Sequence, residues 1–213
     1  MLKLTRLTFA ILALTALSQQ LLIHVAASYN ILNFFSYFTN LSNIFAAVIL
    51  LLCVFLKSSG SQDIARYVST VNMTVVGLVF AVLLRNVDLG SLLPWVNFAL
   101  HYVMPVAIVL DWVVNPPTIR LKPRQVFFAL AFPIIYLLYV IIRGAITGWY
   151  PYPFLNPAKV GGNGVVAAYS LALAATVTLF SWVFFAVGNR LSSAKPSQKH
   201  DGPVAYSDKV SDL

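Results

Sequence analysis

Two side chains in this sequence have the chemistry of a nucleophile and its base. Thr39 lies in the segment SYFTNLSNIF, where Ser36, Thr39, Asn40 and Asn43 share one face of an apolar helix. His101 lies in a second apolar segment, NFALHYVMPVAIVLDW. A hydroxyl is a poor nucleophile by itself, but a neutral imidazole within hydrogen-bond reach can take its proton. The residue types therefore suggest a Thr–His pair.

The surroundings of His101 favour a site. Asn97 lies one helical turn before it on the same face and is a candidate orienting partner. Pro105, four residues after it, has no N–H to donate to the His101 carbonyl, which predicts a kink and a free acceptor. The alternative is a histidine that is hydrogen-bonded between helices for packing alone.

The depth of the two residues in their spans is compatible with contact. Thr39 lies about 12 Å into the apolar stretch 32–56, and His101 lies about 15 Å into the stretch 92–114. Both stretches would cross the membrane in the same direction. We therefore predict Thr39 as nucleophile and His101 as base in the outer half of the bilayer.

The two asparagines beside Thr39 have open roles. Asn40 and Asn43 could orient the pair or donate to a developing oxyanion. Ser, Thr and Asn also link transmembrane helices to one another, at about 0.6 to 2 kcal/mol per interaction. The spacing alone fits this structural role as well.

Other polar groups fall in the outer half of the predicted spans and could line a cavity or hold a lipid head group. They are Gln20, His24, Arg85, Tyr136 and Arg143. Snorkelling to the interface is the alternative for the two arginines. Asp111 lies about 15 Å along the helix from His101, too far for a triad, so we predict pairing with the basic loop residues near the inner surface.

The composition requires a membrane around these residues. The chain has 213 residues, of which 60% are hydrophobic and 9% charged, and it contains no Glu. A soluble domain is about a quarter charged. Spanning helices need about 20 apolar residues, so we predict an all-α bundle of six transmembrane helices forming one domain over 1–190. The spans are 5–27, 32–56, 66–85, 92–114, 125–143 and 165–188. The basic start of the first could also mark a signal peptide, but its long apolar stretch favours a retained span.

The distribution of Lys and Arg predicts the orientation. Eleven would lie on the inner side and three on the outer side if both termini are cytoplasmic. The outer ones are Arg85, Arg143 and Lys159. The net charge of +8 follows from this bias and does not indicate nucleic-acid binding. The loop NPPTIRLKPRQ is expected to contact anionic lipid headgroups at the cytoplasmic face.

Three further features complete the prediction. Residues 191–213 are polar and predicted to be a disordered cytoplasmic tail. The aromatic loop GWYPYPFLNPAKVGGNG is expected to anchor at the outer interface or to cover a cavity. The single cysteine, Cys53, allows no internal disulfide or metal site, and neither a metal nor a cofactor is implied.

Three separated segments carry a resemblance to known proteins. SYFTNLSN, LHYVMPVAIVLDW and YPYPFLNP resemble a family of small six-span bacterial integral membrane proteins. That family is distantly similar to the animal androgen-induced and androgen-dependent membrane proteins, threonine hydrolases that cleave esters of fatty acids with hydroxy fatty acids. The resemblance implies the same roles for Thr39 and His101, and a multi-pass protein of a bacterial inner membrane.

We therefore expect an intramembrane lipid ester hydrolase that uses a Thr nucleophile and a His base, with a membrane lipid or lipid ester as substrate. The alternative is a non-enzymatic polytopic protein that transports or binds a small hydrophobic ligand. In a scaffold protein, a third possibility, the polar stripe around Thr39 would face another subunit.

Overall fold

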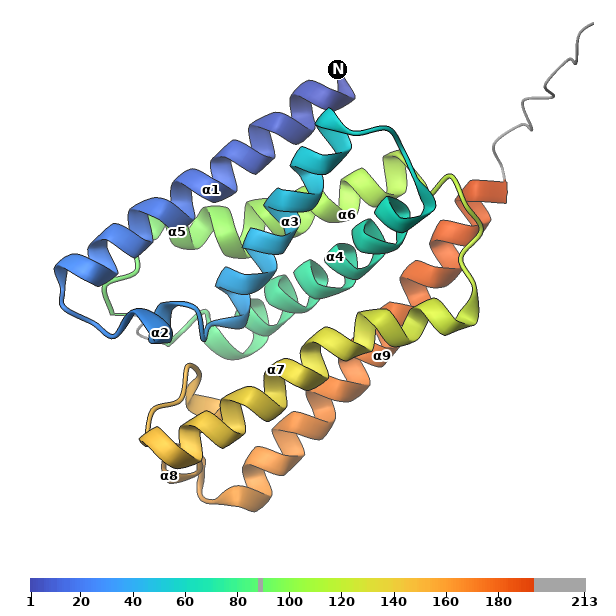
Figure 1. Ribbon diagram of the computed structural model, residues 1–213. Helices are drawn as coiled ribbons and strands as arrows, with labels where there is room; N and C mark the ends of the chain where they lie inside the picture. The colour runs from blue at the N-terminus through green and yellow to red at the C-terminus, as the bar shows by residue number, and fades with distance from the viewer. Residues whose placement is uncertain (88–89, 194–213) are drawn as a thin grey trace, which may run out of the picture.

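The computed structural model describes residues 1–87 and 90–193, and the fold within them is entirely helical (Figure 1). The helices are, in chain order, α1 (Leu2–Ala26), α2 (Ile31–Phe34), α3 (Phe38–Phe55), α4 (Gly60–Val79), the π-helical turn η1 (Phe80–Leu84), α5 (Pro94–Phe98), the π-helical turn η2 (Ala99–Val103), α6 (Met104–Val114), the 3-10 turn η3 (Pro123–Gln125), α7 (Val126–Thr147), the 3-10 turn η4 (Pro153–Leu155), α8 (Pro157–Val160) and α9 (Asn163–Ser193).

Within the described residues, six helical stretches are long and apolar enough to cross a membrane. They are Leu2–Ala26, Phe38–Phe55, Gly60–Leu84, Pro94–Val114, Pro123–Thr147 and Asn163–Ser192. The all-helical, six-span architecture predicted from the sequence is confirmed, and the chain is a multi-pass membrane protein. The start of α1 and the end of α9 lie at the same end of the bundle (Figure 1), as an even number of spans requires.

The second span is shorter than the predicted stretch 32–56. Its first residues form the separate helix α2, and the chain is non-helical at Ser36 and Tyr37 before α3 begins at Phe38. Thr39 is therefore the second residue of a helix rather than a residue eight positions into one. At the other end, α9 continues to Ser193, three residues into the stretch predicted as a tail, and the rest of that stretch, 194–213, lies outside the described residues.

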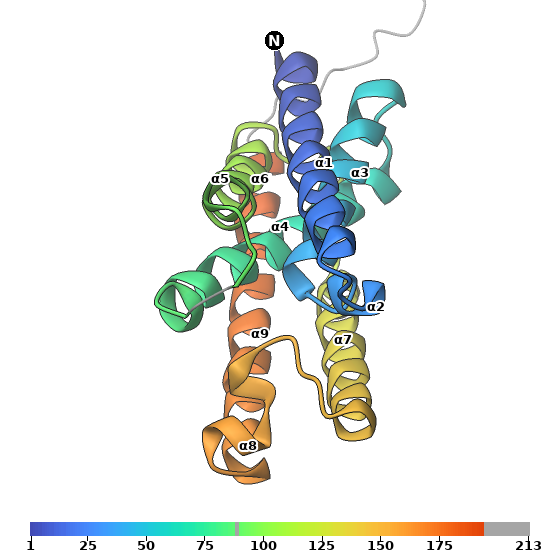
Figure 2. The same cartoon turned by 90° about the vertical axis from the view of Figure 1, so that its left-hand side faces the viewer.

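Helix α4 is the centre of the bundle. It packs against α3, α6, α7 and α9, and its span is the most buried of the six. The pair α7 and α9 lies along one side, and α1 packs on α3 on the other (Figures 1 and 2). Fully buried alanines, Ala10, Ala13, Ala46 and Ala47, line the contact between α1 and α3, where small side chains let two backbones approach closely.

A buried ion-pair network ties three spans together near the end that holds the N-terminus. Asp111 of α6 accepts hydrogen bonds from Arg6 of α1 at 2.7 Å and from Arg66 of α4 at 2.8 Å. Arg66 also donates to Asp63 at 3.2 Å, and Asp63 accepts from the Thr118 backbone and hydroxyl. Asp111 therefore pairs with basic side chains, as expected, though both come from spans rather than from the loop.

The network predicts a large loss of stability when one partner is removed. Asp111→Ala leaves the buried guanidinium group of Arg6 without a carboxylate and leaves Arg66 with Asp63 alone, and we expect it to lower the free energy of unfolding by about 3 kcal/mol or more. Thermal denaturation of the purified protein in detergent measures the effect. The exposed Arg124→Ala is the control, and equal melting temperatures for the two variants would contradict the prediction.

Candidate functional site

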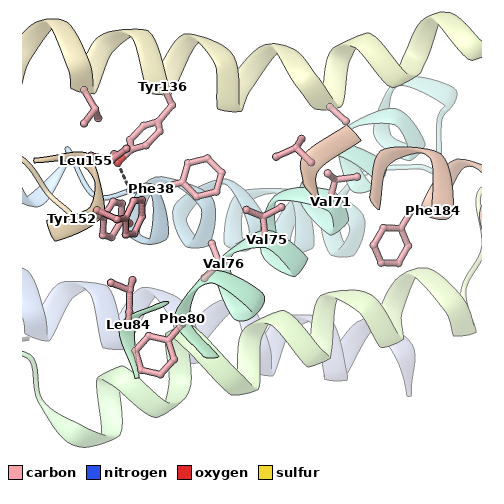
Figure 3. Close-up of a cluster of buried hydrophobic side chains, with 14 of the residues drawn as sticks. Phe38, Val71, Val75, Val76, Phe80, Leu84, Tyr136, Tyr152, Leu155 and Phe184 are labelled. Atoms are coloured by element: carbon pink, nitrogen blue, oxygen red, sulfur yellow. Dashed lines mark hydrogen bonds between the residues drawn. The ribbon is translucent and has the colours of Figure 1, made fainter. Parts of the chain in front are cut away.

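The N-terminus of α3 carries the candidate nucleophile. Tyr37 precedes the helix in an extended conformation and supplies no side-chain cap, so the first N–H groups need other acceptors. Two tyrosine hydroxyls provide them: Tyr136 Oη accepts from the Phe38 N–H at 3.2 Å, and Tyr152 Oη accepts from the Thr39 N–H at 3.3 Å. Figure 3 shows Tyr136 reaching from α7 toward Phe38, with Tyr152 nearby. The positive end of the α3 dipole therefore lies at Thr39.

The candidate base lies on an irregular turn of the fourth span. Residues Ala99–Val103 form the π-helical turn η2, and Pro105 follows at the start of α6. The His101 ring stacks on Phe80 of η1, with ring centroids 4.2 Å apart. Gly77 of α4 faces this turn, and a Cβ there would come within 3.1 Å of Pro105 and 3.6 Å of the His101 carbonyl. The irregularity predicted from Pro105 is thus a π-helical turn packed closely against α4.

Thr39 and His101 are in contact. Thr39 Oγ1 lies 3.3 Å from His101 Nε2, and both residues are buried. His101 Nδ1 lies 3.1 Å from the backbone carbonyl of Asn97. A carbonyl oxygen can only accept, so Nδ1 carries the ring proton and Nε2 presents its lone pair to the threonine. The imidazole is therefore in the tautomer that a general base needs.

Tyr152 is the third member of the cluster, and it was not predicted from the sequence. Its hydroxyl lies 3.4 Å from Thr39 Oγ1. Because Thr39 gives its only hydroxyl proton to His101, the hydrogen bond between Tyr152 and Thr39 must be donated by the tyrosine. Burial raises the pKa of Tyr152, which keeps the hydroxyl protonated and able to donate. A directed chain of hydrogen bonds runs from Tyr152 through Thr39 to His101.

Two hollows meet at this cluster. The larger, which we call the polar cavity, has a volume of about 400 Å³ and is lined by polar groups that include Gln20, His24, Asn33, His101 and Lys159. The smaller, which we call the apolar pocket, has a volume of about 140 Å³ and is lined by residues of α4, α7, η4 and α9 that include Val76, Leu137, Leu155, Leu173 and Val177. Thr39, Leu84 and Tyr152 line both hollows.

Comparison with known proteins identifies the family. The profile of the FAR-17a/AIG1-like proteins matches residues 78–186, which is just over half of the chain. The chain belongs to the FAR-17a/AIG1-like family. No curated protein and no solved structure matches the chain significantly. The resemblance to the androgen-induced membrane proteins is thereby confirmed at the level of the family.

The part of this FAR-17a/AIG1-like protein that matches the profile contains two of the three clustered residues. His101 and Tyr152 lie within residues 78–186, whereas Thr39 lies before them. The contact between Thr39 and His101 is thus an observation made on the fold, independent of the profile match.

The asparagines predicted as orienting or oxyanion residues all act through the protein's own backbone. Asn43 Nδ2 donates to the carbonyls of Thr39 and Leu100, at 2.9 and 3.2 Å, and so joins α3 to η2 beside the pair. Asn40 Nδ2 donates to the Phe34 carbonyl at 2.8 Å. Asn97 orients His101 with its main-chain carbonyl rather than with its amide, whose oxygen has no hydrogen-bond partner. The side chains of Asn40 and Asn43 and the main chain of Asn97 therefore support the site.

Two of the five residues predicted for a cavity or head-group site line the polar cavity. Gln20 bonds with the Ser91 carbonyl and the Leu93 N–H, and His24 Nε2 lies 2.9 Å from the Asn30 carbonyl, so both connect α1 to neighbouring loops. Tyr136 lines the apolar pocket instead and donates to the Ser36 carbonyl at 2.8 Å.

The two arginines predicted for the cavity do not line either hollow at the cluster. Arg85 is exposed at the end of η1. Arg143 donates to Asn33 Oδ1 at 2.6 Å and its guanidinium lies 4.9 Å from the centre of the Trp149 ring. These positions fit the snorkelling alternative for Arg85 and a link between α7 and its neighbouring loops for Arg143.

The aromatic loop after α7 covers the polar cavity. Its residues Trp149 to Pro153 line that cavity, and Tyr37 packs edge-on against both Trp149 and Tyr152. Phe154 stacks on Tyr152 with the two rings nearly parallel, at 4°. The loop thus positions the Tyr152 hydroxyl at the cluster. The sequence offered the loop's aromatic content as a signal, but not which ring would turn inward.

Proposed function

We propose that this protein is an intramembrane lipid ester hydrolase with Thr39 as nucleophile and His101 as general base. The observation that carries the proposal is the 3.3 Å contact between Thr39 Oγ1 and the unprotonated Nε2 of His101. The burial of Thr39, Asn40 and Asn43 inside the bundle argues against a polar stripe that faces another subunit. The family membership adds support, because the resemblance described above implies threonine hydrolases.

The first half of the reaction transfers the acyl group to the protein. Thr39 Oγ1 gives its proton to His101 Nε2 and attacks the ester carbonyl carbon. The tetrahedral intermediate collapses when its bond to the alcohol oxygen breaks, and that oxygen takes the proton back from His101. The products of this half are the free alcohol and an ester of Thr39 with the acyl group.

The second half uses water. His101 takes a proton from a water molecule that enters from the polar cavity, and the hydroxide attacks the Thr39 ester. Collapse of the second intermediate releases the acid and returns the proton to Thr39 Oγ1. The net reaction consumes one water and one ester to give one acid and one alcohol, and these steps need no metal or cofactor.

The oxyanion of each intermediate has two stabilising groups within reach. Thr39 is the second residue of the 18-residue helix α3, where the helix dipole favours negative charge. The Tyr152 hydroxyl donates to Thr39 Oγ1 in the resting protein. Once Thr39 Oγ1 has bonded to the substrate carbon, the Tyr152 hydroxyl can donate to the oxyanion instead. Esters of fatty acids with hydroxy fatty acids are the substrate type that the resemblance suggests.

A covalent label tests the proposal directly. The purified protein in detergent is treated with a fluorophosphonate probe and then digested, and the modified peptide is located by mass spectrometry. We expect the adduct on Thr39. A folded protein that stays unlabelled, or that carries its label on another residue, would contradict the assignment of the nucleophile.

Removal of the Tyr152 hydroxyl should slow the reaction without unfolding the site. We expect Tyr152→Phe to lower kcat by about 10- to 100-fold, somewhat less than for a well-aligned oxyanion donor, because its contacts to Thr39 are long. Ester hydrolysis in detergent measures it. Tyr150→Phe is the matched control, since Tyr150 lines the same cavity without bonding to Thr39. Equal rates for both variants would remove Tyr152 from the mechanism.

A further inference from the structure

The two hollows at the cluster are not equivalent in their access to the acid–base residue. Thr39 lines both the polar cavity and the apolar pocket, whereas His101 lines only the polar cavity. Tyr152 and Leu84 also line both hollows, so together with Thr39 they form the boundary between the polar cavity and the apolar pocket. A substrate whose carbonyl carbon lies at Thr39 Oγ1 can therefore place one of its halves in each hollow.

The position of His101 decides which half goes where. The alcohol oxygen has to take a proton from His101 Nε2 when its bond to the carbonyl carbon breaks. That oxygen must consequently lie on the side of the polar cavity, and the acyl chain must leave the carbonyl on the opposite side. Resting on the proposed function, we infer that the acyl chain binds in the apolar pocket and the alcohol portion binds in the polar cavity.

The apolar pocket opens sideways at the surface of the bundle. Ile134 of α7 and Ala174 and Thr178 of α9 line it, and all three are exposed where those two helices run beside each other. In a bilayer this surface faces hydrocarbon. A long acyl chain can therefore fill the pocket and extend between α7 and α9 into the membrane. The pocket has no closed end there that would limit the length of the acyl chain.

The polar cavity suits a different kind of group. Its lining combines Gln20, Asn33 and Lys159 with the aromatic residues of the loop, and its volume is about 400 Å³. Hydroxyl or other polar groups on an alcohol find hydrogen-bond partners there. The substrate class is thus an ester of a long-chain fatty acid, drawn from the membrane, with an alcohol that carries polar groups.

The test blocks the apolar pocket at its lipid edge. Ala174→Trp fills the pocket from an exposed helical position, so it need not disturb the core, and Ile134→Trp repeats the block from α7. Ala175→Trp makes the same change one residue along on the exposed face of α9, outside the pocket. Two substrate series are compared: acetyl, octanoyl and palmitoyl esters of glycerol, and acetate esters of alkanols of increasing length.

We expect the pocket variants to discriminate between acyl chain lengths in the glycerol ester series, and not between alcohol lengths in the acetate series. Ala174→Trp and Ile134→Trp should lower kcat/KM for the palmitoyl ester relative to the acetyl ester by about tenfold or more, whereas Ala175→Trp should leave the ratio unchanged. An unchanged ratio in the pocket variants, or a loss that follows alcohol length in the second series, overturns the orientation. Acetyl ester hydrolysis that is equally fast in Thr39→Ala would instead refute the proposed function itself.

Discussion

Thr39→Ala should abolish ester hydrolysis, with a fall in kcat on the order of 1,000-fold or more, because no other hydroxyl in the cluster lies on His101 Nε2. The variant loses two long neutral hydrogen bonds, one to His101 and one from Tyr152, each worth about 1 kcal/mol, so the fold should persist. Release of fatty acid from a lipid ester in detergent measures the rate, and thermal denaturation checks the fold. Thr39→Ser keeps the hydroxyl and should retain activity.

A second hydroxyl on the same helix provides the matched control. Ser42 of α3 is fully buried, lines neither hollow, and its oxygen has no hydrogen-bond partner. Ser42→Ala should therefore leave the rate unchanged. If Thr39→Ala and Ser42→Ala hydrolysed the ester equally well, Thr39 would be only a packing residue.

His101→Ala is expected to lower kcat by about 100- to 10,000-fold, the range for a lost general acid–base residue. The remaining activity would come from the α3 N-terminus and Tyr152. His24→Ala is the control, because His24 lines the same cavity but bonds to the Asn30 carbonyl rather than to Thr39. The rates of both variants are measured with the same ester.

A chemical rescue separates catalysis from packing in the histidine variant. The polar cavity is large enough for a free imidazole to occupy the space vacated beside Thr39. Added imidazole should therefore restore part of the activity of His101→Ala and have no effect on Thr39→Ala. Loss of thermal stability in both variants, without rescue, would favour histidine and threonine as helix-linking residues.

The sequence by itself determined the class of fold and pointed to Thr39 and His101, which the structure places in contact. The charged fraction is too low for a soluble surface, and six apolar stretches are long enough to span a membrane. In lipid, helices satisfy the backbone hydrogen-bonding groups within each of these stretches. The depth counted for Thr39 assumed a helix that starts at residue 32, whereas α3 starts at Phe38, so residue counting alone does not explain the contact with His101.

Only the tertiary structure decided how the site is completed. The break at Ser36 and Tyr37 contains no Gly or Pro, so neither residue type marks in the sequence that α3 starts just before Thr39. Arg85 is exposed and Arg143 bonds to Asn33 without lining either hollow at the cluster, which the sequence did not predict because a residue count gives depth and not the rotation of a helix against its neighbours.

Tyr152 and the two hollows depend on contacts across more than a hundred residues of chain. The Tyr152 hydroxyl reaches Thr39 because the loop after α7 folds back over α3, and the stacking of Phe154 holds that ring in place. The Asn97 carbonyl selects the His101 tautomer because His101 lies in the π-helical turn η2, which places its Nδ1 3.1 Å from that carbonyl. The packing of helices and loops against one another sets these hydrogen bonds. The order of residues along a single helix does not predict that packing.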